Sequence, residues 1–94
     1  MRIREIVWLP KIIEKLEQKH QVSPYEVRKA LNNNSRIFFR ETGYVEGEHL
    51  YEALSRTDAG RYLAIFFIRK PRDKALIISA RNMDRAERKR YGKK

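Results

Sequence analysis

The sequence predicts an α+β fold, in which two N-terminal helices precede a three- to four-stranded antiparallel meander sheet and a short C-terminal helix follows it. Three observations favour this class. Apolar residues recur at helical spacing up to about residue 31, they alternate or run together between residues 36 and 80, and a new helix-start signal follows at residue 84. With 94 residues, the chain is expected to form a single domain spanning 1–94.

The first third of the chain carries the two predicted helices. Residues 3–8 alternate weakly and are compatible with a short strand, and Pro10 then suits the first turn of a helix that should end near His20. The second helix has the clearest start signal, because residues 23–26 (Ser-Pro-Tyr-Glu) form a capping box with proline at the first helical position. Three asparagines, at 32–34, should end this helix, since asparagine competes for backbone hydrogen bonds.

The remainder of the chain predicts strands and one more helix. Four segments have the alternation or the apolar content of strands, at 36–41, 48–57, 62–68 and 74–80. Residues 62–68 are apolar on both faces, which places that strand centrally in the sheet. Residues 84–87 (Asp-Arg-Ala-Glu) form a second capping box and start the last helix.

The charge of the chain is concentrated at its C-terminal end. Twenty-two lysines and arginines against twelve acidic residues give a formal charge of +10. Residues 69–94 carry eleven basic and three acidic groups, so +8 of this excess lies in the last quarter of the sequence. A concentration of this kind is typical of proteins that bind a polyanion, most often nucleic acid.

Composition also excludes several classes of site. The chain has no cysteine, which removes disulfides, thiolate nucleophiles and cysteine-based metal centres. Its two histidines lack metal-binding spacing, and its glycines match no phosphate-binding loop, so we expect no metal and no cofactor. No apolar run is long enough to span a membrane, and the N-terminus does not resemble a signal peptide, so a cytoplasmic protein with no membrane partner is expected.

Arginines at strand ends are the first candidates for chemistry. Arg61 opens the third predicted strand and Arg81 closes the fourth, so a hairpin of these two strands would bring both to the same end, close together. Guanidinium groups bind phosphate in bidentate fashion and can stabilise charge that develops on it. Strand pairing alone would leave Glu48 at the opposite end of the sheet from Arg61. The alternative for these arginines is surface charge paired with nearby glutamates.

The last helix and the end of the first helix supply further candidates. Arg85, Arg88 and Lys89 share one face of the last helix, and Tyr91 lies on another, which suits contact with RNA phosphates and bases. His20 lies on the apolar face of the first helix, near its end. This histidine is compatible with a packed side chain and with a general acid or base, and both interpretations stay open.

Several fragments together resemble, in order and spacing, the BrnT family of type II toxins. They are Trp8, residues 19–23 (Lys-His-Gln-Val-Ser), 47–48 (Gly-Glu), 60–63 (Gly-Arg-Tyr-Leu), 77–81 (Ile-Ile-Ser-Ala-Arg) and 87–91 (Glu-Arg-Lys-Arg-Tyr). The resemblance covers nearly the whole chain, and its most specific part is 77–81 followed by Glu-Arg and a near-terminal tyrosine. One departure is Gln21, where the family commonly has glycine; because a non-glycine residue is strained in left-handed geometry, the first helix is expected to end differently here.

The resemblance implies a RelE-like, mRNA-interferase-like fold and a ribonuclease that inhibits translation. It also implies a cognate antitoxin of the ribbon-helix-helix type, similar to BrnA, through which the pair would bind operator DNA. By position, the resemblance carries a catalytic role onto four residues, His20, Glu48, Arg61 and Arg81. It adds Arg88 and Tyr91 in support, beside the RNA-binding candidates Arg85 and Lys89.

We therefore expect a metal-independent endoribonuclease in which the RNA 2′-hydroxyl attacks the adjacent phosphate. Glu48 or His20 would accept the proton, and Arg61 and Arg81 would hold the phosphate. The alternative is a non-catalytic basic module that binds RNA or an acidic protein.

Overall fold

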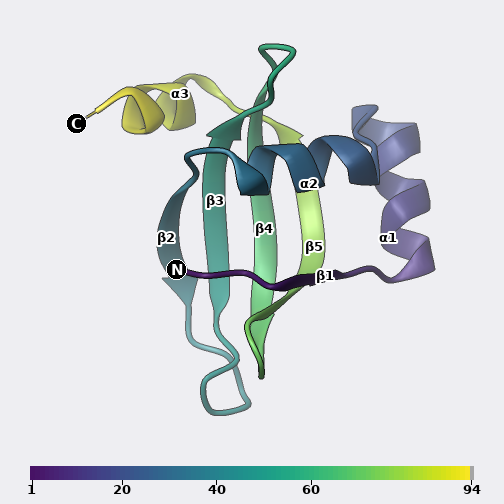
Figure 1. Ribbon diagram of the computed structural model, residues 1–94, viewed down its shortest axis with the longest axis vertical. Coiled ribbons are helices and arrows are strands. Elements are labelled where there is room, and N and C mark those ends of the chain that lie inside the picture. The colour runs from purple at the N-terminus through teal and green to yellow at the C-terminus, as the bar shows by residue number, and fades with distance from the viewer. Residues whose placement is uncertain (94) are drawn as a thin grey trace.

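The computed structural model describes residues 1–93, which form a five-stranded sheet and its helices. In chain order the elements are β1 (Glu5–Val7), α1 (Pro10–Lys15), the π-helical segment η1 (Leu16–His20), α2 (Pro24–Asn32), β2 (Arg36–Glu41), β3 (Leu50–Arg56), β4 (Tyr62–Lys70), β5 (Lys74–Asn82) and α3 (Arg85–Gly92) (Figure 1). The predicted α+β class is confirmed, as are the two N-terminal helices, the meander and the C-terminal helix.

The sheet has the strand order β1-β5-β4-β3-β2. Strands β2 to β5 form an antiparallel meander, and β1 adds to its edge, parallel to β5. The apolar strand β4 is the middle strand, as its two apolar faces predicted. The weakly alternating residues before Pro10 therefore include an edge strand.

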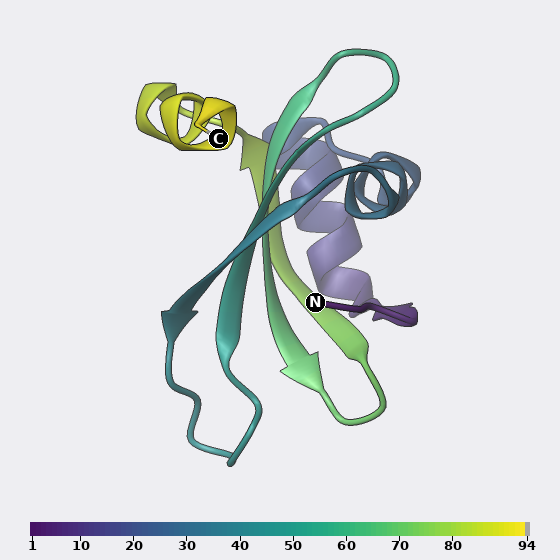
Figure 2. The ribbon, with the colours of Figure 1, turned by 60° about the vertical axis from the view of Figure 1, so that its left-hand side comes forward.

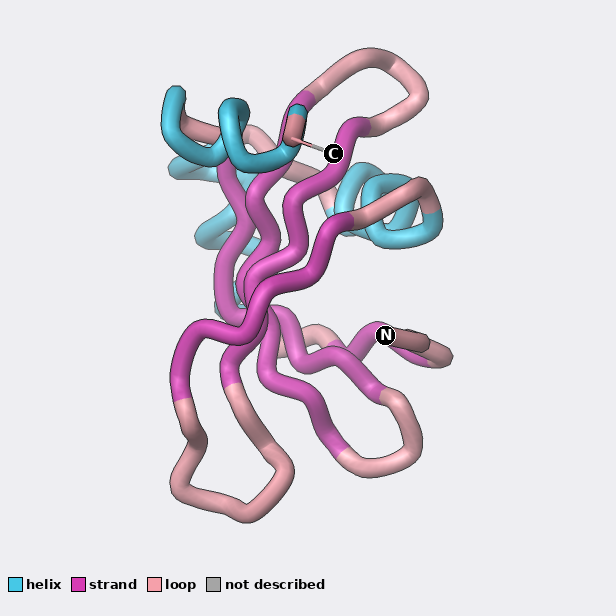
Figure 3. The backbone as a smooth tube through the Cα atoms, turned by 90° about the vertical axis from the view of Figure 1, so that its left-hand side faces the viewer, coloured by secondary structure: helices cyan, strands magenta, loops and turns pink. Residues whose placement is uncertain are grey.

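The helices lie on opposite sides of this sheet. Figure 2 shows α1 and α2 on one side and α3 on the other, and Figure 3, which looks toward the β2 edge, shows α2 and α3 on opposite sides of the twisted sheet. We call the side under α1, η1 and α2 the helix face and the other side the open face. The helix face presents from the strands Ala53, Ser55, Leu63, Ile65, Phe67, Ala75, Ile77 and Ala80. The open face presents Phe38, Glu52, Leu54, Tyr62, Ala64, Phe66, Ser79 and Arg81.

The hydrophobic core lies between the helix face and the N-terminal helices. Leu16, Val22, Val27 and Ala30 pack there against strand residues such as Phe67. All five are essentially inaccessible to solvent, and burial of each large apolar side chain contributes about 1.5–3 kcal/mol. Val22 and Val27 flank the start of α2, where a hydrophobic staple fixes the angle at which the chain enters the helix.

Both predicted capping boxes are present. The Glu26 N–H donates to Ser23 Oγ over 3.2 Å, and the Ser23 N–H donates to Glu26 Oε1 over 3.1 Å. At α3, the Glu87 N–H donates to Asp84 Oδ1 and the Asp84 N–H donates to Glu87 Oε1, each over 2.8 Å. These reciprocal bonds satisfy backbone donors that a helix start otherwise leaves unpaired.

The first helix ends in a left-handed residue although that residue is not glycine. Gln21 has φ 50° and ψ 43°, and its N–H donates to the Leu16 carbonyl. Gln21 thus takes the left-handed conformation that glycine favours, and the chain accepts its strain of about 1 kcal/mol.

A β-bulge in β5 decides which face Arg81 occupies. Phe67 pairs with Ile77 whereas Phe66 pairs with Ser79, so Ile78 is an extra residue in the ladder. Without the bulge, simple alternation from Ile77 would place Ser79 and Arg81 on the helix face. The bulge moves both to the open face, which is the re-aiming of side chains that bulges produce near functional sites.

Candidate nucleic-acid interface

Two carboxyl groups lie at the centre of the open face. Glu52, on β3, is 1% exposed and accepts a hydrogen bond from Arg90 Nη2 over 2.8 Å. Glu87, on α3, accepts two from Arg81, over 2.6 Å and 2.8 Å. The two carboxyls lie close enough that each affects the pKa of the other.

The surroundings move the pKa values of this pair in opposite directions. Burial raises the pKa of Glu52, and the hydrogen bond with Glu87 raises it further, against the opposing effect of Arg90. Burial would also raise the pKa of Glu87, but hydrogen bonds from Arg81 and from the Asp84 backbone outweigh it and lower that pKa to about 2. Glu87 is therefore a stable anion that fixes the Arg81 guanidinium in place.

Arginines also cover the aromatic rings of the open face. The Arg88 guanidinium carbon lies 3.6 Å from the centre of the Tyr62 ring, and that of Arg56 lies 5.3 Å from the same ring. Arg81 lies 5.3 Å from the centre of the Phe66 ring. Phe38, on β2, is covered in the same way by Arg90 at 5.1 Å and Arg36 at 5.8 Å. Guanidinium groups that lie over rings beside free surface are a common setting for nucleic-acid binding.

Helix α3 is held to this face mainly by polar contacts. Arg36 on β2 donates to the carbonyls of Arg90 and Lys93 at the end of the helix. The Tyr91 and Tyr62 rings meet edge to face, with 6.0 Å between their centres. The remaining basic residues of the helix, Arg85, Arg88 and Lys89, are exposed. Helix α3, which carries all four predicted RNA-binding residues, thus lies with Arg81 at one end of the open face.

Arg61 lies on the other face of the sheet. Its guanidinium donates to the carbonyls of His20 (2.8 Å) and Gln21 (2.6 Å), to Glu26 (2.9 Å) and to Asn82 (2.8 Å). It therefore ties the end of η1 and the start of α2 to the hairpin of β4 and β5. Arg61 and Arg81 both lie at the predicted end of the hairpin, but they occupy opposite faces of the sheet, because the bulge at Ile78 turns Arg81 away.

The two predicted proton acceptors do not join Arg81 either. Glu48 precedes β3 at the opposite end of the sheet and pairs with Lys70, as strand pairing alone predicted. His20 ends η1 on the helix side, where its carbonyl accepts from Arg61. The four residues given a catalytic role by position therefore occupy three separate places, and their roles stay predictions.

Two residues central to the open face were missed from the sequence. Glu52 carried a usable signal, since it is a carboxylate directly before Ala53 and Leu54 in an apolar strand, where only a partnered charge is tolerated. Its partner Arg90 lies 38 residues away. Nothing in the sequence distinguishes Arg90 from the other basic residues of the last helix.

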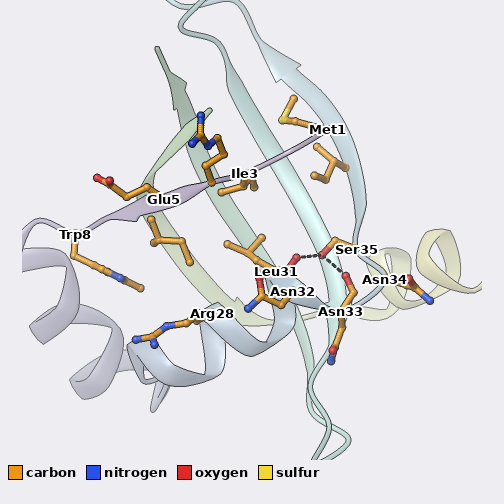
Figure 4. Close-up of a pocket in the computed structure, with 13 residues that line it drawn as sticks. Met1, Ile3, Glu5, Trp8, Arg28, Leu31, Asn32, Asn33, Asn34 and Ser35 are labelled. Carbon is orange, nitrogen blue, oxygen red and sulfur yellow. Dashed lines mark hydrogen bonds between the residues drawn. The ribbon is translucent and has the colours of Figure 1, made fainter. Parts of the chain in front are cut away.

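The hollow shown in Figure 4 is not at this site. It has a volume of about 610 Å³ and lies on the helix side, between the N-terminal segment and α2, where Trp8, Arg28 and Leu31 line it (Figure 4). None of the predicted site residues lines it. Within residues 1–93, no group of three or more His, Asp or Glu side chains could hold a metal ion, and no helix is long and apolar enough to cross a membrane.

Comparison with known proteins supports the fold. No protein-family model matches the sequence, and no curated protein matches it. Among solved structures, the chain matches the crystal structure of the Brucella abortus ribonuclease toxin BrnT with a TM-score of 0.63 and 14% identity. The match covers 86% of this chain and 97% of that one. The chain therefore has the α+β fold of the BrnT ribonuclease toxin.

Proposed function

We propose that this chain is the toxin of a type II toxin–antitoxin system, a metal-independent endoribonuclease that cleaves RNA in the cytoplasm and so inhibits translation. The observation that carries the proposal is the open face, where Arg81 and the basic residues of α3 gather around aromatic rings on a fold shared with a ribonuclease toxin. The charge of this face suits a phosphate chain, and its rings suit unpaired bases.

In the proposed reaction the RNA 2′-oxygen attacks the adjacent phosphorus. A 2′,3′-cyclic phosphate forms, the bond from phosphorus to the 5′-oxygen breaks, and that oxygen leaves as a hydroxyl after it takes a proton from water. Arg81 is pre-oriented by Glu87 and would bind the phosphate oxygens on which negative charge develops. Arg85, Arg88 and Lys89 would bind flanking phosphates, with Tyr91 beside them.

The acceptor of the 2′-hydroxyl proton is solvent in this proposal. Glu48 and His20 are placed away from Arg81, and Glu87, with a pKa of about 2, is too weak a base at neutral pH. The expected pH profile is a cleavage rate that rises about tenfold per pH unit from pH 6 to 9. A markedly slower cleavage in Glu48→Gln or His20→Gln would instead assign the proton to that residue.

The activity is tested with purified protein and RNA in the presence of EDTA. Arg81→Ala should slow cleavage about 100-fold or more, the usual cost of a lost transition-state donor. Arg28→Ala is the matched control, because Arg28 is an exposed arginine on α2, on the other side of the sheet. Failure of the wild-type protein to cleave any RNA, naked or ribosome-bound, would contradict the enzymatic proposal.

The number of phosphates held can be measured by salt dependence. On a single strand, log K falls with log salt by about 0.7 for each phosphate contact. Removal of one exposed cation, as in Arg88→Ala, should reduce the slope by about 0.7, whereas Arg28→Ala should leave it unchanged. These titrations use 2′-O-methyl RNA, which lacks the attacking hydroxyl and so separates binding from cleavage.

The proposed partner is an antitoxin of the ribbon-helix-helix type, similar to BrnA. An acidic segment of the antitoxin would compete with RNA for the basic open face, and operator DNA would be bound only through the antitoxin. Induced expression of the chain alone should stop growth, and co-expression of the neighbouring gene should restore it. Normal growth under induction would contradict the toxin assignment.

One observation favours a second function, that of a non-catalytic RNA-binding module. Arg81 is already bound to Glu87, and no predicted base lies beside it. A module of this kind would bind 2′-O-methyl and unmodified RNA equally and would leave both intact.

A further inference from the structure

The Tyr62 ring differs from every other tyrosine in residues 1–93 in having arginines over it from two elements. Arg88 comes from α3 and Arg56 from the end of β3, with guanidinium carbons at 3.6 Å and 5.3 Å from the ring centre. The Tyr62 ring also meets the Tyr91 ring edge to face, with 6.0 Å between ring centres, whereas on the helix face Tyr51 stacks on Phe67 with 5.8 Å between ring centres. We propose that Tyr62 is a base-stacking site for single-stranded RNA, and this inference rests on the proposed function.

The two arginines over Tyr62 are free to leave it. Both are exposed, and in the described part of the chain neither is paired with a carboxylate. Arg81, in contrast, is fixed by two hydrogen bonds to Glu87. A nucleobase can therefore replace Arg88 on the ring, while the displaced guanidinium gains a phosphate partner; an exposed cation–π contact is weak enough for this exchange.

The position of Tyr62 relative to Arg81 specifies which base it holds. Arg81 pairs across the ladder with Ala64, which is two residues from Tyr62 on the same strand and the same face. The Arg81 guanidinium itself lies over Phe66, four residues from Tyr62, and four residues span about 13 Å along a strand, about two steps of an extended nucleic-acid chain. A base on Tyr62 would thus belong to a nucleotide about two positions from the phosphate that Arg81 binds.

The test is fluorescence anisotropy with a short 2′-O-methyl oligonucleotide, so that cleavage plays no part. Tyr62→Leu should weaken binding about tenfold or more, whereas Tyr62→Phe, which keeps the ring, should stay within about twofold of wild type. Tyr44→Leu is the matched control, because Tyr44 is a fully exposed tyrosine in the loop between β2 and β3. Thermal unfolding of each variant verifies that it is folded.

A second series identifies stacking itself. Oligonucleotides with one base removed at successive positions should bind wild type more weakly at one position, and Tyr62→Leu should show no added loss there. The salt slope should be the same for Tyr62→Leu and wild type, since no phosphate contact is removed. Equal binding by Tyr62→Leu and wild type, or additive losses at every position, would overturn the inference and leave the proposed function standing. Absence of binding by the wild-type protein itself would overturn both.

Discussion

On the helix face of the sheet Ile65 and Phe67 are completely buried, whereas on the open face Tyr62 and Phe66, from the same strand, are half-buried under arginines. The helix face is closed by apolar packing, and its buried hydroxyl, Ser55 Oγ, donates to the Ala30 carbonyl over 2.6 Å. On the open face, arginines instead pair with buried carboxylates and lie over aromatic rings. Because successive side chains of a strand point to opposite faces, one strand supplies residues to the core on one face and to the candidate site on the other.

Arg61 and Arg81 show the same contrast between two residues of one type. Arg61 donates hydrogen bonds to the carbonyls of His20 and Gln21 and to Glu26, and it thereby links the N-terminal helices to the sheet. Arg81 is held by one carboxylate, beside an arginine-rich surface. An arginine at a strand end thus links the packed layers or lies on an open surface according to the face that it occupies.

The largest expected effect comes from neighbouring phenylalanines on the two faces. Phe67→Ala should lower the free energy of unfolding by about 3–5 kcal/mol, because it opens a cavity in the core. Phe66→Ala should cost less than half as much, since its ring is only half-buried. Urea denaturation of the two variants measures both values. Equal losses would contradict the division of the sheet into a closed and an open face.

The next effect concerns Arg61. Arg61→Ala removes hydrogen bonds to two carbonyls, to Glu26 and to Asn82, and should cost about 2–4 kcal/mol of stability. Arg88→Ala, on the open face, should change stability by less than about 0.5 kcal/mol. A stable Arg61→Ala protein that no longer cleaves RNA would restore the catalytic role that the resemblance implied.

A smaller effect should depend on pH. The pKa of Glu52 is raised, so above pH 4.5 the folded state keeps a proton that the unfolded state has lost, and the wild type loses stability as pH rises toward the raised pKa. Glu52→Gln mimics the protonated form and still faces Arg90, Arg40 and Glu87. Across that pH range the free energy of unfolding of the variant should rise relative to that of wild type, by about 1.4 kcal/mol for each pH unit by which the pKa is raised.

The measurement is urea denaturation of both proteins at a series of pH values from 3 to 8. Glu87 sets the opposite trend at the acid end, because its contribution is present above pH 4.5 and is lost as pH falls toward about 2. Parallel curves for wild type and Glu52→Gln would show that Glu52 keeps its ordinary pKa.

The smallest effect lies at the end of η1. Gln21→Gly should stabilise the protein by about 0.5–1 kcal/mol, because the left-handed conformation strains a side chain but not glycine. Gln18→Gly, inside the helical segment, is the control and should destabilise by about 1 kcal/mol. A loss of stability in Gln21→Gly would mean that its side-chain bond to the Gln18 carbonyl outweighs the strain.

Much of the fold could be predicted from local chemistry. The capping boxes at Ser23 and Asp84 fixed two helix starts, and the apolar run of β4 fixed the central strand. These signals are readable because each depends on residues within a few positions of one another.

The candidate site was less predictable because it depends on long-range pairing. The bulge at Ile78, which decides the face of Arg81, leaves no mark in a run of apolar residues. The bond between Glu52 and Arg90 joins a strand to a distant helix. The end of the sheet at which Arg81 and α3 lie could therefore be predicted. The face that Arg81 occupies could not, because a single extra residue in the ladder determines it.

NMR of the arginine side chains distinguishes RNA binding at the open face, which we propose, from RNA binding at the helix face. The Nε–Hε signals are followed while a 2′-O-methyl oligonucleotide is added to the protein. The signals of Arg81, Arg88 and Arg90 should shift, and those of Arg28 and Arg61 should stay in place. Shifts confined to Arg28 and Arg61, with the open-face arginines unmoved, would contradict the account.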